Sequence, residues 1–394
     1  MPQIPAGWEE TTLGKLLDVK HGFAFKWDYI SDKDNGNVLL TPWNFAIWGG
    51  WKDWKKFYNW EIPISYILKW WEIVITMTDL SKDWDTLGFP AIVPIDDKRI
   101  FLHNQRIWLV EFISDNLDLK YCFYKLKTNE YQKYVVNTAS WSTVRHTSPD
   151  KIKSFIFHRP SLPEQQAIAA VLSSFDDKIE LLRAENQTLE QMGQELFKER
   201  FGKWKIGDEL PEGWRVGKLG KEIKFIKGKK PKAVSDSYKE GRIPQVLIET
   251  LDGWISLFAD PEKSILLNSG EIVMVMDGAS SGRCEIGFSW VLWSTLAKIE
   301  VNPSLKLMLY ALLKNKFKEI NGWTTGSSIP HTDKHKICDF DFIIPTKETL
   351  YDFNKLYWNL IEKILLNRKQ IQTLSVTRDQ LLPKLMSGEV RVEF

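Results

Sequence analysis

Basic side chains that could contact phosphate gather in one part of the chain. Residues 215–242 carry ten Lys and Arg against three Asp and Glu, while the net charge of the whole chain is only +2. The centre of this stretch is a Lys-Gly-Lys-Lys-Pro-Lys turn, with side chains at Lys227, Lys229, Lys230 and Lys232. Lysines on a turn of this kind suit contacts to a nucleic-acid backbone. A solvated basic face without a ligand is the other interpretation.

A short polar loop occurs twice and is a second candidate for such contacts. Its hydroxyl and imidazole groups suit hydrogen bonds to phosphates or base edges, and a guanidinium at Arg145 could bind guanine with two hydrogen bonds. The alternative is that the loop caps the structure that follows and that its histidine packs on a helix. The members are Ser142, Thr143, Arg145 and His146 in the first copy, and Ser327, Ser328 and His331 in the second.

The first half of the chain adds a smaller polar set. Lys26, Lys55 and Lys56 are candidates for phosphate contacts, and Arg106 follows Asn104-Gln105 in a group suited to base-edge hydrogen bonds. The same group could also lie in a strand without any ligand.

Other chemistry is poorly supported by the residues. His331 and His335 have the i, i+4 spacing of a zinc pair, but no third ligand is placed near them, so we expect no metal. Asp96-Asp97-Lys98 only faintly resembles a nuclease motif, and a solvated turn explains it better. The sequence has no Walker A motif for ATP, and Asn302-Pro303-Ser304 is not the Pro-Pro-aromatic motif of an adenine methyltransferase. We therefore expect no enzyme activity in this chain.

Tryptophan is unusually frequent, with 19 Trp against 23 Gly. An aromatic excess could stack on sugars or anchor protein partners, so a carbohydrate-binding or protein-interaction scaffold is the alternative function. Internal repeats place Trp71 opposite Gly270 and Trp141 opposite Gly326, and other Trp lie in turn-like contexts. We therefore expect several Trp, such as Trp54 and Trp60, to occupy backbone sites that suit glycine, and we do not interpret the excess as function.

Length and composition indicate a soluble protein of two to three domains. The chain has 394 residues, of which 43% are hydrophobic and 26% charged. No segment has the length and apolar character of a membrane helix, and the first residues resemble no secretory signal. Three cysteines, far apart and in no CxxC pair, make a disulfide framework improbable. We expect a cytoplasmic protein that does not contact membranes.

The elements that must position these residues occur twice. Three matching segments keep their order while the shift falls from 206 to 199 to 185, namely 4–15 with 210–221, 69–77 with 268–276, and 142–152 with 327–337. The chain is therefore a tandem of two related units. Each unit begins with short apolar runs typical of strands, including 37–42, 72–77, 106–112, 264–267, 271–276 and 295–301. Helical spacing over 117–135 and 305–320 makes each globular part α+β.

Each unit ends in a long helix. Ser161, Pro163 and Glu164 predict a capping box at the start of the first helix, and Thr346 takes the place of Ser161 in the second. Apolar residues then recur every 3.5 residues over four heptads, which predicts a coiled coil. Asn186 and Asn367 interrupt the apolar positions. In an antiparallel pair they meet near the middle and fix the register, whereas a parallel pair leaves both unsatisfied, so we predict the antiparallel arrangement.

Taken together, these features resemble the DNA specificity subunit of Type I restriction–modification systems. The resemblance rests on two Gly-Trp-x4-Leu-Gly starts, two α+β domains, two capped helices, the first opening with Pro160 to Gln165, and the closing Leu-Leu-Pro-Lys-Leu-Met-Ser-Gly. It implies target recognition domains at 1–160 and 203–345, with a linker at 203–209, a spacer helix at 161–202, and a second spacer helix with the C-terminal tail at 346–394.

The resemblance also implies partners and a role. The two domains would each read one half of a bipartite, asymmetric site in double-stranded DNA, and the paired helices would hold them apart and dock two modification subunits. About 38 helical residues span roughly 57 Å, the length of about 17 base pairs. S-adenosylmethionine, ATP and Mg²⁺ would belong to the modification and restriction subunits, which carry adenine-N6 methylation, translocation and cleavage, and no cofactor is expected in this chain.

Overall fold

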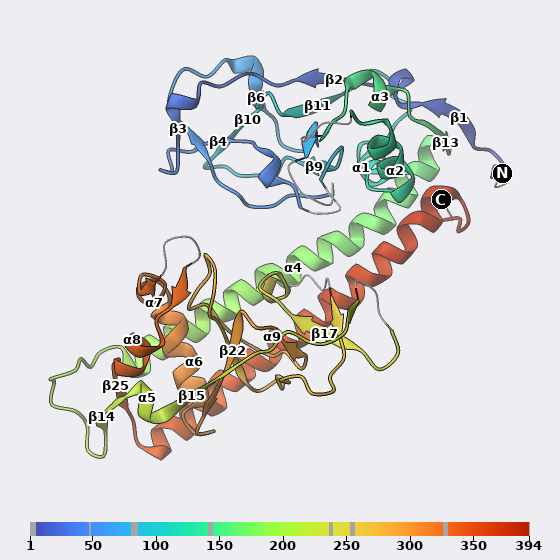
Figure 1. Ribbon diagram of the computed structural model, residues 1–394. Coiled ribbons are helices and arrows are strands. Elements are labelled where there is room, and N and C mark those ends of the chain that lie inside the picture. Colours follow the sequence, from blue (N-terminus) through green and yellow to red (C-terminus); the bar gives the residue numbers. More distant parts are fainter. Residues whose placement is uncertain are drawn as a thin grey trace. The chain divides into compact units, whose positions relative to one another are not determined.

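The chain folds into two compact units, and the boundary between them falls inside two long helices. The computed structural model describes residues 5–46, 49–79, 86–140, 145–235, 239–252, 257–325 and 330–393. These compact units are not identical to the two repeats of the sequence. Unit 1 comprises residues 1–178 and 374–394, and unit 2 comprises residues 179–373. The helices are α4 (Leu162–Phe201) and α9 (Lys347–Ser387), so each unit contains a globular part and segments of both helices (Figure 1).

The globular part of unit 1 is built on two β-sheets, one antiparallel and one mixed. Apolar side chains from the runs predicted as strands make the inner faces of both. The antiparallel sheet runs in the order β2 (Leu17–His21), β11 (Ile107–Phe112), β7 (Ile73–Thr76) and β9 (Pro90–Ile92). The mixed sheet runs in the order β3 (Ile30–Ser31), β5 (Phe57–Tyr58), β4 (Asn37–Leu39), β10 (Ile100–Leu102) and β6 (Ile67–Leu68).

Short elements connect the antiparallel sheet to the helices of unit 1. The segment predicted as helical divides into α1 (Leu119–Leu126) and α2 (Asn129–Thr138), because Thr128 caps a new helix through a hydrogen bond from the Tyr131 amide. The strand pairs are β1 (Glu9–Thr12) with β13 (Ile156–Arg159), and β8 (Thr78–Asp79) with β12 (Arg145–His146), while α3 (Pro149–Lys153) follows β12.

The two ends of the chain meet at the first turn of α4. Glu164 is 2% exposed and accepts hydrogen bonds from Trp8 Nε1 at 3.3 Å and from Arg391 Nε and Nη2 at 2.6 and 2.9 Å. The predicted capping box is therefore wrong, because the Glu164 carboxylate binds Trp8 and Arg391, near the two ends of the chain, and not Ser161. The cap predicted at Thr346 is confirmed by a hydrogen bond from the Thr349 amide at 3.2 Å.

Unit 2 repeats this plan. Its antiparallel sheet runs in the order β15 (Ile223–Lys227), β22 (Leu296–Val301), β19 (Ile272–Val275) and β20 (Cys284–Ile286). This is the order β2, β11, β7, β9 with each strand replaced by its repeat equivalent, which confirms the tandem. The second sheet runs in the order β16 (Val234–Ser235), β18 (Phe258–Ala259), β17 (Ile243–Val246) and β21 (Val291–Leu292). The strand predicted at 264–267 is wrong, since this segment makes only a single bridge at Leu266.

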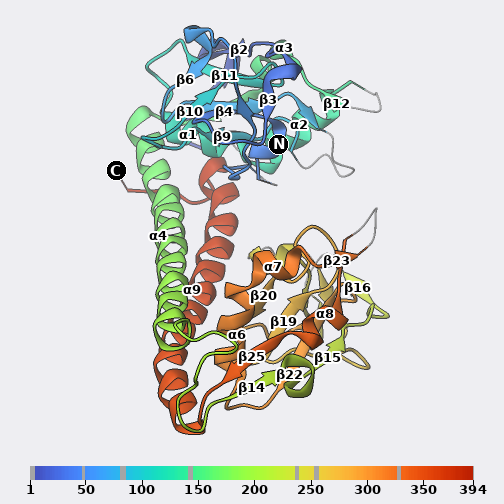
Figure 2. The ribbon, with the colours of Figure 1, turned by 90° about the vertical axis from the view of Figure 1, so that its left-hand side faces the viewer.

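Helix α6 (Lys306–Asn315) joins the sheet of unit 2 to the long helices (Figure 2). Apolar residues of α6 share one core with β19, β20 and β22 on one side and with Phe197, Phe353 and Tyr357 on the other. The remaining elements are the strand pairs β14 (Arg215–Lys218) with β25 (Asp341–Ile344) and β23 (Thr324–Thr325) with β24 (His331–Thr332), and the helices α5 (Leu219–Glu222), α7 (Phe317–Asn321) and α8 (Lys334–Asp339).

Within unit 2 the two long helices run antiparallel and meet at their asparagines. Asn367 is 1% exposed, and its Nδ2 donates to Asn186 Oδ1 at 2.9 Å and to Glu185 Oε2 at 2.8 Å. Residues further along α4 face residues earlier on α9, as in the contact of Phe201 with Phe353 at 5.0 Å between ring centroids. The predicted orientation and the predicted asparagine contact are both present, because the amide pair satisfies groups that an apolar interface would leave unpaired.

The helix segments of unit 1 are joined by a polar group. Arg378 of α9 forms an ion pair with Asp176 of α4, and Tyr124 Oη donates to the same carboxylate at 2.6 Å. Among the described residues, no helix has the combination of length and apolar character needed to cross a membrane.

Candidate nucleic-acid interface

A histidine–aspartate pair connects the repeated loop of unit 2 to the end of its central strand. His331 begins β24, and its Nδ1 lies 2.8 Å from Oδ1 of Asp277, the second residue after β19. The backbones of the two residues also form an isolated antiparallel bridge. The side chain of His331 is 54% exposed, whereas that of Asp277 is 20% exposed. The strand end therefore holds the imidazole in place and leaves it accessible to a ligand.

The basic turn reaches the same point. Lys227 is the last residue of β15, and its Nζ lies 3.8 Å from Oδ2 of Asp277. Gly228 follows, and a Cβ on this glycine would lie 2.1 Å from the carbonyl oxygen of Trp293, so only glycine fits. Two groups that the sequence placed about one hundred residues apart, the lysine turn and the repeated loop, thus converge on one carboxylate.

The lysines beyond Gly228 remain available. Lys229, Lys230 and Lys232 are all exposed, and none of them pairs with a carboxylate in the described part of the chain. Unpaired ammonium groups on an exposed turn raise the local positive potential, which favours a polyanion.

Unit 1 contains the equivalent arrangement with different chemistry. His146 is exposed at the end of β12, and its Nδ1 lies 3.1 Å from Thr78 Oγ1 in β8. The repeat relates Thr78 to Asp277 and His146 to His331, so both units place a histidine against the second residue after an inner strand of the sheet, β7 in unit 1 and β19 in unit 2. Only the partner differs, a neutral hydroxyl in unit 1 and a carboxylate in unit 2.

Arg106 belongs to this edge of unit 1. Its backbone carbonyl accepts a hydrogen bond from the Met77 amide at 3.3 Å, directly before Thr78, and its side chain is exposed. His21 was missed by the sequence reasoning. It is exposed at the end of β2, where the 206-residue shift makes it the equivalent of Lys227. Gly22 after it would place a Cβ 2.0 Å from the Asn104 carbonyl oxygen, as Gly228 does at Trp293. Extending the repeat alignment by six residues would have found it.

Other predicted residues lie in less suitable places. Arg145 is only 7% exposed, so the proposed bidentate contact to guanine needs correction, because a buried guanidinium cannot reach a base edge. Lys55 pairs with Asp53 at 2.8 Å and Lys56 with Asp32 at 2.5 Å, which reduces the charge that either offers to phosphate. Lys26 is exposed. The predictions at Ser142, Thr143, Ser327 and Ser328, and the one at Trp141, lie outside the described residues.

Several exposed tryptophans in the described part of unit 1 lie next to another aromatic ring. Trp60 stacks on Tyr29 with ring centroids 4.5 Å apart, so one of its faces is already covered, and Trp43 lies 6.1 Å from Trp54. Trp71 has a φ of 70°, the left-handed backbone conformation that glycine favours. The expectation of a glycine-like site is confirmed there, but it is wrong for Trp54 and Trp60, whose φ angles are not positive.

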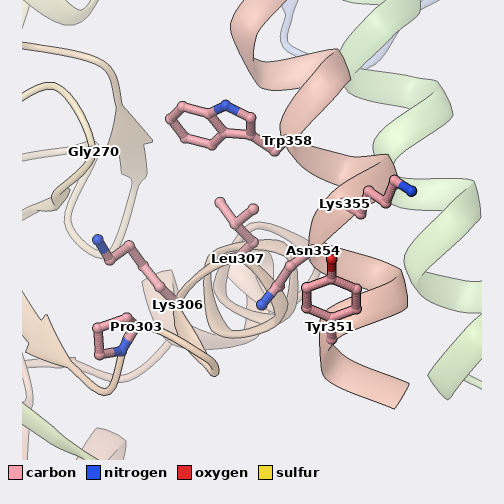
Figure 3. A pocket seen from close by; sticks show the side chains of 8 residues that line it. All are labelled: Gly270, Pro303, Lys306, Leu307, Tyr351, Asn354, Lys355 and Trp358. Atoms are coloured by element: carbon pink, nitrogen blue, oxygen red, sulfur yellow. The ribbon is translucent and has the colours of Figure 1, made fainter. Parts of the chain in front are cut away.

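An open pocket of about 450 Å³ lies elsewhere in unit 2, between α6 and α9 (Figure 3). Lys306 and Lys355 lie at its edges, and Tyr351 and Trp358 of α9 complete the wall. None of the predicted nucleic-acid contacts lines it. The pocket residues Asn354, Lys355 and Trp358 correspond in the repeat to Ala169, Ala170 and Ser173 on α4, so the lining of the pocket is not repeated in the first half of the chain.

Known proteins identify the family of this fold. The sequence profile described as "Type I restriction modification DNA specificity domain" matches residues 5–191 and 211–374. The MjaIX specificity subunit of a Type I restriction enzyme from Methanocaldococcus jannaschii is 30% identical over 306 residues, which are 71% of each chain. The HindI specificity subunit of Haemophilus influenzae is 22% identical over 345 residues, covering 67% of this chain and 75% of its own.

The fold agrees with this relationship. The crystal structure of the Type I restriction–modification S subunit from M. genitalium matches 98% of both chains with a TM-score of 0.58 at 19% identity. The two sequence matches each include one globular part and most of the long helix that follows it, so they correspond to the two copies of the repeated plan. The chain therefore belongs to the family of Type I restriction–modification DNA specificity subunits.

Proposed function

We propose that each unit reads one half of a bipartite DNA site through the edge at which its repeated histidine lies. The observation that supports this most directly is the recurrence of the pair, Thr78 with His146 and Asp277 with His331, next to exposed basic residues. If the histidine contact only supported the fold, we would expect the same partner residue in both units. If the contact reads DNA, its partner should differ between units that read different half-sites.

The lysine turn has a different part in this proposal. Lys229, Lys230 and Lys232 would neutralise phosphates and contribute affinity without regard to sequence. The histidines, Arg106 and the neighbouring loops would contribute discrimination between bases. Because the residues at the two edges differ, the two half-sites would differ, and the whole site would be asymmetric.

We further propose that the antiparallel helices hold the two recognition domains at a fixed separation and dock two modification subunits. Adenine-N6 methylation with S-adenosylmethionine, and ATP- and Mg²⁺-dependent translocation and cleavage by restriction subunits, would be supplied by those partners. The chain itself would act as a non-catalytic subunit that selects the sequence.

Selection from a random pool of DNA duplexes tests this function. The full chain, purified with its modification subunits, is expected to enrich two short sequences separated by a constant spacer, and the binding should weaken steeply as salt is raised. Binding that shows salt dependence but no enrichment of any sequence would contradict the proposal. The sequences methylated in a genome that encodes this protein provide an independent check, because they should contain the same two halves.

A further inference from the structure

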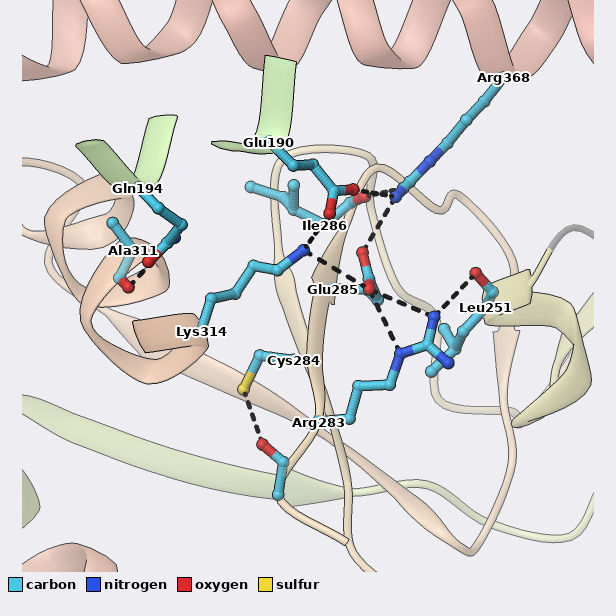
Figure 4. Close-up of polar contacts among 11 residues, drawn as sticks. Glu190, Gln194, Leu251, Arg283, Cys284, Glu285, Ile286, Ala311, Lys314 and Arg368 are labelled. Atoms are coloured by element: carbon cyan, nitrogen blue, oxygen red, sulfur yellow. Dashed lines mark hydrogen bonds and ion pairs between the residues drawn. The ribbon is translucent and has the colours of Figure 1, made fainter. Parts of the chain in front are cut away.

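Five charged side chains, of which one is buried and four are partly exposed, form a cluster between the recognition domain of unit 2 and its two long helices (Figure 4). We call it the Glu285 cluster. It combines one residue of α4, one of α9, one of α6, one of β20 and one from the loop before β20, namely Glu190, Arg368, Lys314, Glu285 and Arg283. The globular domain and both long helices thus contribute to one group of charges.

Arg368 makes the most directional contact in the cluster. Its Nη2 donates to Glu285 Oε2 at 3.0 Å, and its Nη1 donates to the backbone carbonyl of Ile286 at 2.8 Å. A planar guanidinium therefore holds two consecutive residues of β20 at once. This geometry fixes both the distance and the rotation of the strand with respect to α9, which a single point charge could not do.

Lys314 connects the same carboxylate to the other long helix. Its Nζ lies 3.0 Å from Glu190 Oε2 on α4 and 3.7 Å from Glu285 Oε1. The side chain of Glu285 is 6% exposed. Burial alone would raise the pKa of its carboxyl, but the charges of Lys314, Arg368 and Arg283 outweigh that effect and hold the pKa below its ordinary value. Glu285 is therefore ionised at neutral pH despite its burial.

The cluster lies at the base of the candidate interface. Strands β19 and β20 form a hairpin, and the loop between them carries Asp277, which holds His331. Arg283 ends that loop, and its Nε lies 3.3 Å from Glu285 Oε1 while its carbonyl accepts the Val275 amide at 2.8 Å. A backbone hydrogen bond thus connects Arg283 of the cluster to Val275, which lies two residues before Asp277, the residue that holds the histidine.

The repeat does not contain this anchor twice. The equivalent of Arg368 on α4 is Arg183, whose side chain is 47% exposed and, among the residues that the structure describes, forms an ion pair only with Glu180 of its own helix. Unit 1 joins its domain to the helices through Tyr124, Asp176 and Arg378 instead. The Glu285 cluster is therefore a property of unit 2 and not a requirement of the fold.

Ion pairs removed from water contribute little net stability compared with apolar contacts of the same size, and in some proteins their role is to specify one geometry over its neighbours. We propose that Arg368 and Glu285 are positioning residues that fix the angle between the second recognition domain and the helices, and so restrict the spacer length at which the second half-site is accepted. This inference rests on the proposed function, because it assumes that unit 2 reads a half-site.

Spacer discrimination provides a sensitive measure of that angle. Adding or removing one base pair moves one half-site by about 3.4 Å and rotates it by about 34° around the duplex axis. A rigid domain cannot follow this change, whereas a domain that can tilt on its helices can. The quantity to measure is the ratio of dissociation constants between the preferred spacer and a spacer one base pair longer or shorter.

The experiment uses the full chain with its modification subunits and duplexes built from the selected site. The variants are Arg368→Lys, which keeps the charge but loses the fork, and Glu285→Asp, which keeps the charge but shortens the reach. The control is Arg183→Lys at the repeat-equivalent position. Because the ratio compares two duplexes with one protein preparation, it does not depend on the fraction of protein that is folded.

We expect Arg368→Lys and Glu285→Asp each to reduce the discrimination between spacers by about tenfold, while affinity for the preferred duplex changes by about threefold or less. Arg183→Lys should leave the ratio unchanged. If both cluster variants retain the wild-type ratio, or lose affinity equally for all spacers, the inference is overturned. A wild-type complex without any sequence preference would instead contradict the proposed function, so the two failures can be distinguished.

Discussion

The imidazole of His331 is held by Asp277, with 2.8 Å between Nδ1 and Oδ1. A carboxylate can only accept, so Nδ1 carries the hydrogen in this contact, and Nε2 is the ring nitrogen left for a ligand on a side chain that is 54% exposed. The equivalent His146 contacts the hydroxyl of Thr78, which can donate or accept, so either nitrogen of that ring can carry the hydrogen. The same fold thus presents two different hydrogen-bonding groups, which explains in physical terms how one plan could read two half-sites.

Separate replacement of the two histidines should therefore affect separate half-sites. We expect His331→Ala to lower the affinity for the preferred duplex by about tenfold or more, equivalent to about 1–3 kcal/mol, and to relax the sequence preference of one half only. His146→Ala should do the same for the other half. Selection of random duplexes with each variant measures both effects.

The half-site that is read by the unit without the substitution serves as an internal control in each selection. A uniform loss of affinity, with both preferences retained, would mean that the histidines contact phosphates or support the fold. Loss of both preferences in either single variant would contradict the assignment of one unit to one half-site.

The lysine turn should control the salt dependence of binding. Replacement of Lys229 and Lys230 by Gln removes two unpaired charges, so the slope of log K against log salt should fall by about 1.8 in magnitude if both contact phosphate. Sequence preference should not change, since phosphate contacts carry no base information.

Lys355→Gln offers a matched control for that measurement. Lys355 is also exposed and lies in unit 2, but it lines the pocket between α6 and α9. An equal change of slope per charge removed, about 0.9 for this single lysine, would show that only the total charge matters and that the turn has no special place in binding.

The asparagine pair should stabilise the helices of unit 2. Asn367→Ala leaves Asn186 and Glu185 without their shared donor and creates a small cavity, so the free energy of unfolding should fall by about 2 kcal/mol. Urea unfolding followed by circular dichroism measures this change. Asn359→Ala, at an exposed position of the same helix, should change stability by less than about 0.5 kcal/mol. Equal effects of the two variants would contradict a role for the pair.

Much of the architecture could be predicted because the sequence contains the same order of elements twice. The repeated segments, the strand runs such as 271–276, and the heptads of the long helices all follow from periodicity that a single sequence contains. The meeting of Asn186 with Asn367 could be predicted because only one orientation of the helices satisfies both amides.

The remaining features depend on contacts between residues far apart in the sequence. Glu164 has the spacing of a capping box, but Arg391 and Trp8 compete for its carboxylate, and nothing near Glu164 reveals those partners. Arg145 has the composition of a recognition residue, yet it is buried. The Glu285 cluster could not be predicted either, because its five charges come from four segments that are far apart in the sequence, namely residues 190, 283–285, 314 and 368.

Trp71 offers a test of backbone strain. Its φ of 70° costs a residue with a Cβ about 1 kcal/mol or more, and its side chain is 52% exposed, so it recovers little by burial. We expect Trp71→Gly to raise the free energy of unfolding by about 1 kcal/mol. Trp54→Gly, at a site without positive φ, should instead lower it. Thermal unfolding of both variants decides this, and stabilisation by both or by neither would contradict the strain argument.

His103 should make the stability of unit 1 depend on pH. The ring is 1% exposed, its Nε2 lies 2.8 Å from the Ile107 carbonyl oxygen, and burial lowers its pKa from 6.5 to about 4. The folded protein therefore keeps a neutral ring while the unfolded chain takes up a proton, so stability is full above pH 6.5 and falls as the pH drops towards 4. The loss amounts to about 3 kcal/mol across this interval. In His103→Gln the amide can still donate to Ile107 but does not titrate, so the difference between wild type and variant should shift by that amount. A pH-independent difference in urea unfolding would show that the pKa of His103 is the same in the folded and unfolded states, which would contradict the effect of burial.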